Sequence, residues 1–289
     1  MKNSQIFSRR EMLAGTAMAG AALFLPKTLF GQQSATLYLA AQGSGGIWQF
    51  NTISEDKPTQ FGTTAGLGFR SVVEISSQLY LTTAGSSGIY TFNPSTGDTP
   101  TQFGSTAGLG FNGIVAINET LYLTTQGSDG IWVFNPLTTP NTKPAQISTT
   151  SGLGFNGVVA IGNILYLAAQ GSGGIWQFDT TLDDPPVKFS KTSGLGFRNV
   201  VAINNQLYLT TAGSSGIYTF DPSTQETPTQ FGSTAGLGFN GIFAIGNTLY
   251  LTTQGSAGIW TFNPITTPNI EPAQISTTSG LGFNGLVLG

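Results

Sequence analysis

A six-fold internal repeat is the feature that most constrains the fold of this 289-residue chain. The tripeptide LYL recurs at intervals of 42, 42, 44, 42 and 42 residues. A period of about 40 residues is typical of an array of equal supersecondary units. The six units begin near Leu37, Leu79, Leu121, Leu165, Leu207 and Leu249.

Each unit carries four short strand signals. Around Leu121 they fall at 113–117, 120–125, 130–134 and 144–148, separated by turns rich in Gly, Asn and Pro. Glycine is frequent, at 40 residues, and charged residues make up only 8% of the chain, a composition that disfavours helices. Four strands per unit is the pattern of a propeller blade, so the sequence predicts an all-β, six-bladed β-propeller of four-stranded blades. A horseshoe-shaped solenoid is the alternative.

The two ends of the repeat array favour a closed ring. The first unit starts at what would be the second strand of a blade, and the chain ends in GFNGLVLG, which supplies only a first strand. We therefore predict that residues 285–288 complete the blade that begins at Leu37, which leaves no long free sheet edge. A solenoid would not need two complementary incomplete ends.

The repeat array also contains a second, longer repeat of three units. Units one to three repeat as units four to six at an offset of 128 residues, and segments 79–120 and 207–248 differ at only six of 42 positions. The ring is therefore expected to be pseudo-two-fold, with units one and four on opposite sides.

The N-terminal segment predicts an export signal. Arg9 and Arg10 precede an apolar run over 12–26, and the stretch SRREML resembles a twin-arginine signal. The run of ~14 apolar residues is shorter than the ~20 that a spanning helix needs. We predict a signal over 1–31, a propeller over 32–289, no stable membrane span after signal removal, and a periplasmic or secreted protein. An uncleaved anchor is the alternative.

The stretch VVAIGNILYLAAQGSGGIWQFD, at 158–179, resembles NHL-type and related six-bladed propeller repeats. The resemblance implies the propeller fold over nearly all of residues 36–289. Enzymes with such propellers, including lactonases and streptogramin lyases, use acidic or histidine metal ligands in the central tunnel. A tunnel-site hydrolase or lyase of that type is therefore one alternative function.

The residue types that the chain lacks limit the chemistry that it can perform. The chain has no histidine and no cysteine, which excludes a Ser-His-Asp triad, histidine-bound zinc and thiolate sites. We expect no catalytic residue, no metal site and no cofactor. The net charge is −3, and few basic residues follow the signal, so nucleic acid is not an expected partner.

Two arginines are the main departure from the repeat. Arg70 and Arg198 precede an innermost strand, so they are expected at the mouth of the central tunnel. A ring of amides with two guanidinium groups would suit anions, which guanidinium binds in bidentate fashion. The alternative is that each arginine only fills space and was inherited by duplication. The other four units have asparagine at this position, at Asn112, Asn156, Asn240 and Asn284.

Glu74 is a further departure, because it replaces the alanine of the VAI motif in an innermost strand. We expect it to face the tunnel beside Arg70, either as part of a structural ion pair or as a lone functional acid.

The glycine hairpin of each unit is followed by an aromatic residue. Trp48, Trp132, Trp176 and Trp260 occupy this position in four units, and tyrosine does in two. Flat rings beside amides would suit sugar faces, and packing of the blades is the commoner role for such rings. The hairpins contribute the amides of Gln42, Gln126, Gln170 and Gln254.

These observations favour an exported, non-enzymatic binding or scaffold protein. Its predicted partner is a glycan or an envelope protein, bound through the face that carries the hairpins. A structural platform for protein–protein interaction is a third alternative. We expect a monomer.

Overall fold

The computed structural model describes most of the chain after residue 34. The described residues are 35–41, 43, 45–54, 57–83, 85, 87–125, 130–148, 154–169, 171, 173–182, 184–211, 213, 216–253, 258–277 and 282–289. The predictions for residues 1–31 lie outside them. No helix in these ranges is long and apolar enough to span a bilayer.

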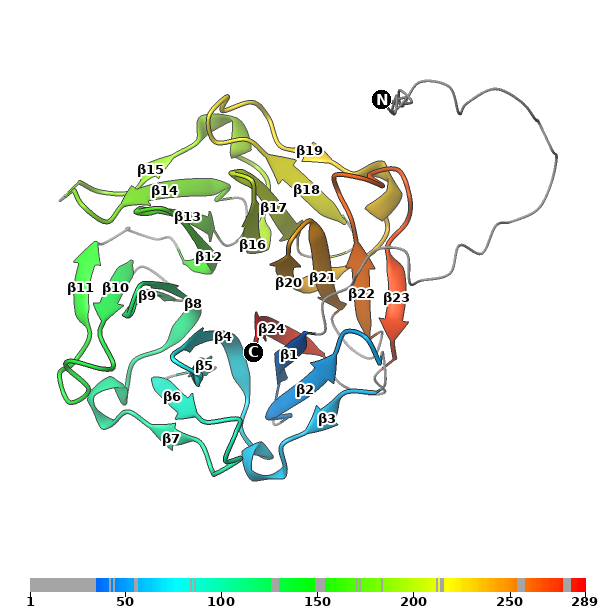
Figure 1. The fold of residues 1–289 in the computed structure, drawn as a ribbon. Coiled ribbons are helices and arrows are strands. Elements are labelled where there is room, and N and C mark those ends of the chain that lie inside the picture. The colour runs from blue at the N-terminus through cyan, green and yellow to red at the C-terminus, as the bar shows by residue number, and fades with distance from the viewer. Residues whose placement is uncertain are drawn as a thin grey trace, which may run out of the picture. The chain divides into compact units, whose positions relative to one another are not determined.

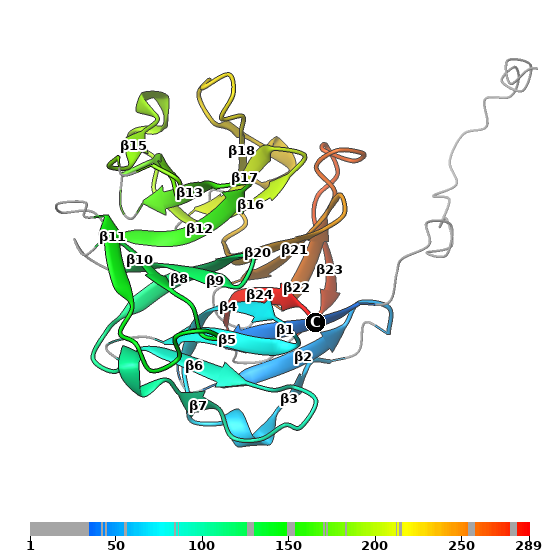
Figure 2. The ribbon, with the colours of Figure 1, turned by 60° about the vertical axis from the view of Figure 1, so that its left-hand side comes forward.

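The strands form six four-stranded antiparallel sheets arranged around a central opening (Figure 1). Five of the sheets contain four strands that are consecutive in the chain, and the sixth combines the two ends of the propeller. Figure 2 shows the same sheets turned by 60°. The predicted six-bladed propeller is confirmed.

Blade 1 comprises β24 (Phe283–Leu288), β1 (Thr36–Ala41), β2 (Ile47–Asn51) and β3 (Thr59–Gln60). Blade 2 comprises β4 (Phe69–Ile75), β5 (Gln78–Thr83), β6 (Ile89–Phe92) and β7 (Thr101–Gln102). Blade 3 comprises β8 (Phe111–Ile117), β9 (Thr120–Thr125), β10 (Ile131–Phe134) and β11 (Ala145–Ser148). In each blade the first strand named is innermost.

Blade 4 comprises β12 (Phe155–Ile161), β13 (Ile164–Ala169), β14 (Ile175–Asp179) and β15 (Val187–Lys188). Blade 5 comprises β16 (Phe197–Ile203), β17 (Gln206–Thr211), β18 (Ile217–Phe220) and β19 (Thr229–Gln230). Blade 6 comprises β20 (Phe239–Ile245), β21 (Thr248–Thr253), β22 (Ile259–Phe262) and β23 (Ala273–Ser276).

The C-terminal strand closes the ring. Strand β24 pairs antiparallel with β1, with Leu37 opposite Leu288 and Leu39 opposite Leu286. The amide of Gly289 adds a hydrogen bond of 2.8 Å to the carbonyl of Thr36. This is the pairing that the incomplete ends of the repeat predicted. Because each strand supplies the other's hydrogen bonds, the first and last parts of the propeller depend on one another.

The hydrophobic core lies between adjacent blades. One cluster joins Ala40 and Ile47 of blade 1 to Phe69, Leu79 and Leu81 of blade 2, and five similar clusters fill the other junctions. Leucines of the LYL motif are fully buried, since both faces of each sheet are covered. The tyrosines face the opposite side, and Tyr80 stacks on Phe103 at 6.0 Å.

A buried threonine fixes the start of the next blade in blades 1, 2, 4 and 5. It ends a short 3-10 helix that follows the outermost strand. The Thr106 hydroxyl accepts a hydrogen bond of 2.8 Å from the amide of Ile89 and donates one of 2.8 Å to the carbonyl of Phe103. A Cβ on Gly88 would lie 2.3 Å from this hydroxyl oxygen, so only glycine fits before Ile89. The four helices are η1 (Gly62–Thr64), η2 (Gly104–Thr106), η3 (Ser190–Thr192) and η4 (Gly232–Thr234).

The GLGF motif is a turn between blades that lies on the same face as the glycine hairpin. Gly108 has a φ of +86°, which glycine adopts without strain, and Phe111 is buried. The amide of Gly88 in the hairpin donates to the carbonyl of Leu109 in the turn at 2.8 Å. Hairpins and turns therefore share one end of the tunnel.

Candidate functional site

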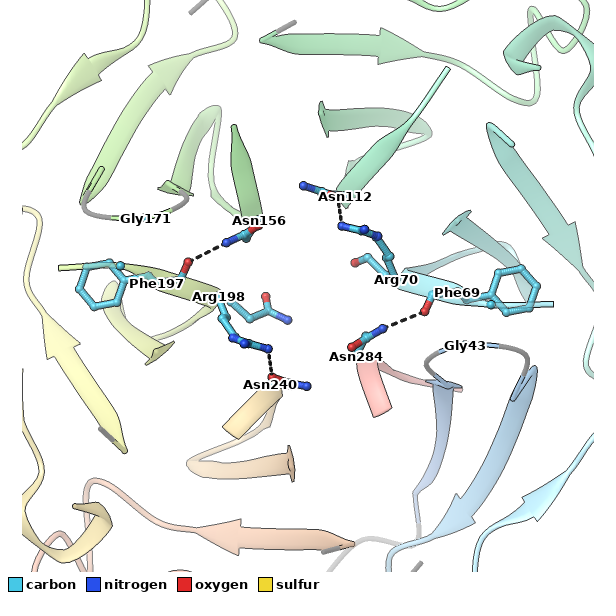
Figure 3. A pocket seen from close by; sticks show the side chains of 14 residues that line it. Gly43, Phe69, Arg70, Asn112, Asn156, Gly171, Phe197, Arg198, Asn240 and Asn284 are labelled. Atoms are coloured by element: carbon cyan, nitrogen blue, oxygen red, sulfur yellow. Dashed lines mark hydrogen bonds between the residues drawn. The ribbon is translucent and has the colours of Figure 1, made fainter. Parts of the chain in front are cut away.

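The candidate site is the mouth, a cavity of about 470 Å³ at the end of the tunnel where the innermost strands begin (Figure 3). Its rim carries one polar residue from each blade, drawn as sticks in Figure 3. The structure brings together all six of the predicted residues at this position, which are Arg70, Asn112, Asn156, Arg198, Asn240 and Asn284.

A β-bulge places each of these residues at the mouth. In blade 2, Phe69 pairs with Thr83 and Ser71 pairs with Thr82, so Arg70 is an extra residue without a partner. The innermost strands of the other five blades show the same register shift at their first residues. A bulge interrupts the alternation of side chains and can direct the extra residue away from the packed faces of the sheet. The bulge is therefore what turns a strand position into a tunnel-mouth position.

The two arginines lie on opposite sides of the mouth (Figure 3). In each case Nη1 donates a hydrogen bond to the Oδ1 of the asparagine in the next blade, from Arg70 to Asn112 and from Arg198 to Asn240. This contact orients the guanidinium group and leaves most of its five N–H donors for other partners. Both arginines are half-buried, and burial lowers the pKa of Arg70 from its ordinary value.

The asparagines mainly join one blade to the next. The Nδ2 of Asn112 donates to the carbonyl of Phe155 at 3.2 Å, and Asn156 bonds in the same way to Phe197 at 3.1 Å. Asn284 donates to Phe69 at 3.2 Å, across the closure of the ring. With the two arginine contacts, these bonds form a belt that runs from blade to blade around the mouth.

The belt has one interruption, at Asn240. Its Nδ2 is buried and has no hydrogen-bond partner, whereas the equivalent atom of Asn112 is satisfied. The interruption lies between blades 6 and 1, and it is the point at which the two halves of the belt differ.

The lining of the mouth is positively charged although the chain is acidic overall. The residues that line it include Arg70 and Arg198 and no aspartate or glutamate. In the described part of the chain, no group of three or more acidic residues lies in a position to hold a metal ion. The two guanidinium charges therefore face a cavity without a carboxylate in its lining.

Glu74 is not part of this site. It lies four residues after Arg70 in β4, which corresponds to about 13 Å along an extended strand, and it does not line the mouth. Among the described residues no ion pair joins Glu74 to Arg70, so the expected pair is not found; Arg70 bonds Asn112 instead. Burial raises the pKa of Tyr38 in blade 1, and the carboxylate of Glu74 adds to this effect.

The hairpin aromatics do not line the mouth either. They occupy the third strand of each blade, are half-buried, and pack edge-on against the phenylalanine of the GLGF motif in the same blade. The ring centroids of Trp48 and Phe283 are 6.2 Å apart, and those of Trp176 and Phe155 are 6.3 Å apart. The same edge-on arrangement holds Trp132 against Phe111 and Trp260 against Phe239.

Two of the indoles also bond to the hairpin backbone. The Nε1 of Trp48 donates to the carbonyl of Gly45 at 2.6 Å, and that of Trp176 to Gly173 at 3.0 Å. This geometry matches the packing interpretation, because ring edge and indole nitrogen are both engaged within the blade. The predicted glutamines Gln42, Gln126, Gln170 and Gln254 lie outside the described residues.

Two further polar residues of the mouth were not predicted, although a departure from the repeat marks both. Ser71 and Asn199, each directly after an arginine, line the mouth, and the other units have glycine at this position. The polar residues thus come in pairs in the two arginine-bearing blades. Glycines of the hairpins and GLGF turns beside these blades complete the wall, at Gly43, Gly68, Gly171 and Gly196.

Fold and site together define a six-bladed β-propeller with a cationic, amide-lined mouth. No protein-family model matches the sequence, and no curated protein matches it. Among solved structures, a chain of the nidogen/laminin complex is similar, with a TM-score of 0.69 and 15% sequence identity. The match covers 89% of this chain and 98% of that one. At this identity the similarity shows the fold alone.

Proposed function

We propose that this protein is a non-enzymatic binding propeller and that the mouth is its ligand site. The observation that carries the proposal is the pair of arginines in a cavity whose lining contains no carboxylate. Guanidinium groups bind carboxylates, sulfates and phosphates through paired N–H donors. The ligand is therefore a polar molecule with negative charge.

The mouth has the size and order that a binding site needs. Its volume of about 470 Å³ falls within the range of roughly 300–1,000 Å³ that is common for small-ligand pockets. The belt of inter-blade hydrogen bonds holds the polar rim in place before a ligand arrives. A preformed site loses less conformational freedom on binding.

We propose a glycan ligand, in an acidic form. The aromatic rings that would have suited a neutral sugar pack inside the blades, and the mouth instead offers cationic and amide groups. A glycan that bears uronic acids presents carboxylates for the arginines and hydroxyl groups for the amides. Acidic oligosaccharides of a cell envelope or cell wall belong to this class.

The export and family proposals accompany this function. We infer that residues 1–31 direct export of a monomeric protein to the periplasm or the exterior, and that the blades are NHL-like. Fusion of residues 1–31 to a reporter tests the export part, because Arg9→Lys with Arg10→Lys should then retain the reporter in the cytoplasm. Export that is indifferent to both substitutions would contradict a twin-arginine signal.

A glycan array with the purified full-length chain tests the binding proposal. We expect retention of acidic glycans, lost at high salt and lost in the double variant Arg70→Asn/Arg198→Asn. The matched control is Lys57→Asn/Lys191→Asn, which removes the same charge from exposed positions and should bind as the unchanged protein does. Binding of neutral glycans only, or equal binding by both double variants, would overturn it.

A further inference from the structure

The mouth consists of two half-sites that are related by the internal duplication of the chain. Residues 70, 112 and 156 correspond to residues 198, 240 and 284 at the offset of 128 that relates the two halves of the chain. One half-site contains Arg70, pinned by Asn112, with Asn284 of the preceding blade beside it. The other contains Arg198, pinned by Asn240, with Asn156 beside it.

Each half-site offers donors and an acceptor together. The arginine supplies the guanidinium N–H groups that the neighbouring Asn112 or Asn240 does not use. The half-buried Asn156 and Asn284 donate through Nδ2 to a backbone carbonyl, and within the described residues their Oδ1 atoms accept no hydrogen bond. Each Oδ1 is thus an acceptor close to the backbone of an arginine-bearing strand.

This combination selects a particular chemical group. A carboxylate has only acceptors, so it suits the guanidinium and is repelled by an amide oxygen. A hydroxyl group can donate to that oxygen. A carboxylate with a hydroxyl on a neighbouring carbon satisfies both parts of a half-site at once.

We propose that the mouth binds a dianion with a hydroxylated carboxylate at each end, such as an aldaric acid, one end at each half-site. The inference rests on the proposed anion-binding function of the mouth, and it names a small dicarboxylate as a ligand in addition to the acidic glycans. The pseudo-two-fold relation of the half-sites, opposite one another in Figure 3, is matched by the similar ends of such a molecule. Binding of the first end raises the effective concentration of the second, which a monoanion cannot exploit.

Calorimetry with a ligand series on the purified full-length chain tests the proposal. The dianions are tartrate, galactarate and glucarate. Tartrate has two carbons fewer between its carboxylates, and galactarate and glucarate differ in the configuration of one hydroxyl group. Adipate lacks the hydroxyl groups, and galactonate lacks the second carboxylate. We expect one hydroxylated dianion to bind about 10- to 100-fold more tightly than galactonate and adipate, at a stoichiometry of one per chain.

Variants of the arginines separate a bridging ligand from one held at a single arginine. Arg70→Asn and Arg198→Asn each install the residue that four other blades already have, so the fold tolerates them. Each single variant should lower the affinity for the dianion by a similar factor, to about the affinity for the monoanion. The double variant should abolish binding. Each single variant still has one intact half-site, so it should bind galactonate at that half-site with the affinity of the unchanged protein. Lys57→Asn is the charge-matched control.

The asparagines test the hydroxyl contact. Asn156→Ala removes the acceptor from one half-site and should reduce the preference for galactarate over adipate without weakening adipate binding. An unchanged preference would remove the hydroxyl part of the proposal.

The outcomes also distinguish this proposal from the proposed function. Acidic oligosaccharides that bind through both arginines, with no small dianion preferred over galactonate, would overturn the dianion and leave the binding function standing. A single phosphate or sulfate ion that contacted both arginines and bound more tightly than any of the dicarboxylates would also overturn it. Ligand binding unaffected by the double arginine variant would refute both proposals.

Discussion

The buried threonine that ends each 3-10 helix offers a sharp test of what organises the blades. In blade 2, Thr106 is fully buried, and its hydroxyl bonds both the amide of Ile89 and the carbonyl of Phe103. Thr106→Val keeps the shape of the side chain and removes both bonds. The amide and the carbonyl then remain buried without this partner, away from water.

The expected loss can be worked from those two groups. A hydrogen bond contributes about 1 kcal/mol, and a buried group left unsatisfied costs about 1–3 kcal/mol. The amide of Ile89 loses its threonine acceptor, while the carbonyl of Phe103 also accepts the Thr106 amide at 2.9 Å and is partly satisfied. We therefore expect Thr106→Val to lower the free energy of unfolding by about 2–4 kcal/mol.

Urea denaturation followed by tryptophan fluorescence measures the loss. Thr106→Ser keeps the hydroxyl and removes one methyl group, so it should cost only about 1 kcal/mol. Thr101→Val, at an exposed strand position, is a second control and should change little. A loss below about 0.5 kcal/mol for Thr106→Val, or a larger loss for serine than for valine, would refute the reasoning.

Three further predictions concern the mouth, the closure and the charged turns. Gly68→Ala would place a Cβ 1.8 Å from the carbonyl oxygen of Gly43, so we expect lower stability and weaker ligand binding, whereas Gly62→Ala has open space and should preserve both in the same denaturation and binding assays. Deletion of residues 282–289 removes the partner of β1 and should abolish cooperative unfolding, unless another segment replaces the strand. Hydrogen bonds from a neighbouring serine lower the pKa of Asp221, so its stabilising contribution should be present at neutral pH and lost as pH falls through the lowered pKa; NMR titration should place that pKa below the ordinary aspartate value.

The sequence was sufficient for the architecture because a propeller is specified by its period. Each blade must bury both faces against its neighbours, so the same apolar pattern recurs in every unit and its incomplete ends indicate closure. The strands predicted around Leu121 differ from β8 to β11 by at most two residues at any boundary. A repeat makes the assignment of strands and turns more certain, because each turn glycine and each buried leucine occurs at the same position in several units.

The details of the site were less predictable for two physical reasons. Whether an aromatic ring such as Trp48 is exposed depends on the packing partner within the blade, here Phe283, and a repeated aromatic residue is compatible with either role. The bulge at Arg70 inserts one extra residue into the pairing of β4 with β5. The alternation of residue types does not show where such a residue is inserted. If the bulge is not known, alternation alone does not show whether the Arg70 side chain points into the mouth. It makes Glu74, four residues later on the same face of the strand, an equally good candidate for the mouth.

The position of the arginines in the belt reconciles the two interpretations that the sequence left open. An asparagine at the bulge, such as Asn156, contacts the backbone of the next blade, and Arg70 contacts the side chain of the next blade instead. Either residue can therefore supply an inter-blade hydrogen bond, so we expect that exchanging them preserves the scaffold.

The exchange should still change what the mouth can bind. An asparagine uses its donor group within the belt, whereas arginine has five N–H donors and commits only part of that set to Asn112. The remaining donors and the positive charge are additional to what the scaffold requires. A space-filling role would account for the contact to the next blade, but it gives no reason for charge to be placed at two opposite points of a cavity without a carboxylate in its lining. Substitution to asparagine should consequently spare stability and remove anion binding, which separates the two roles in one pair of measurements.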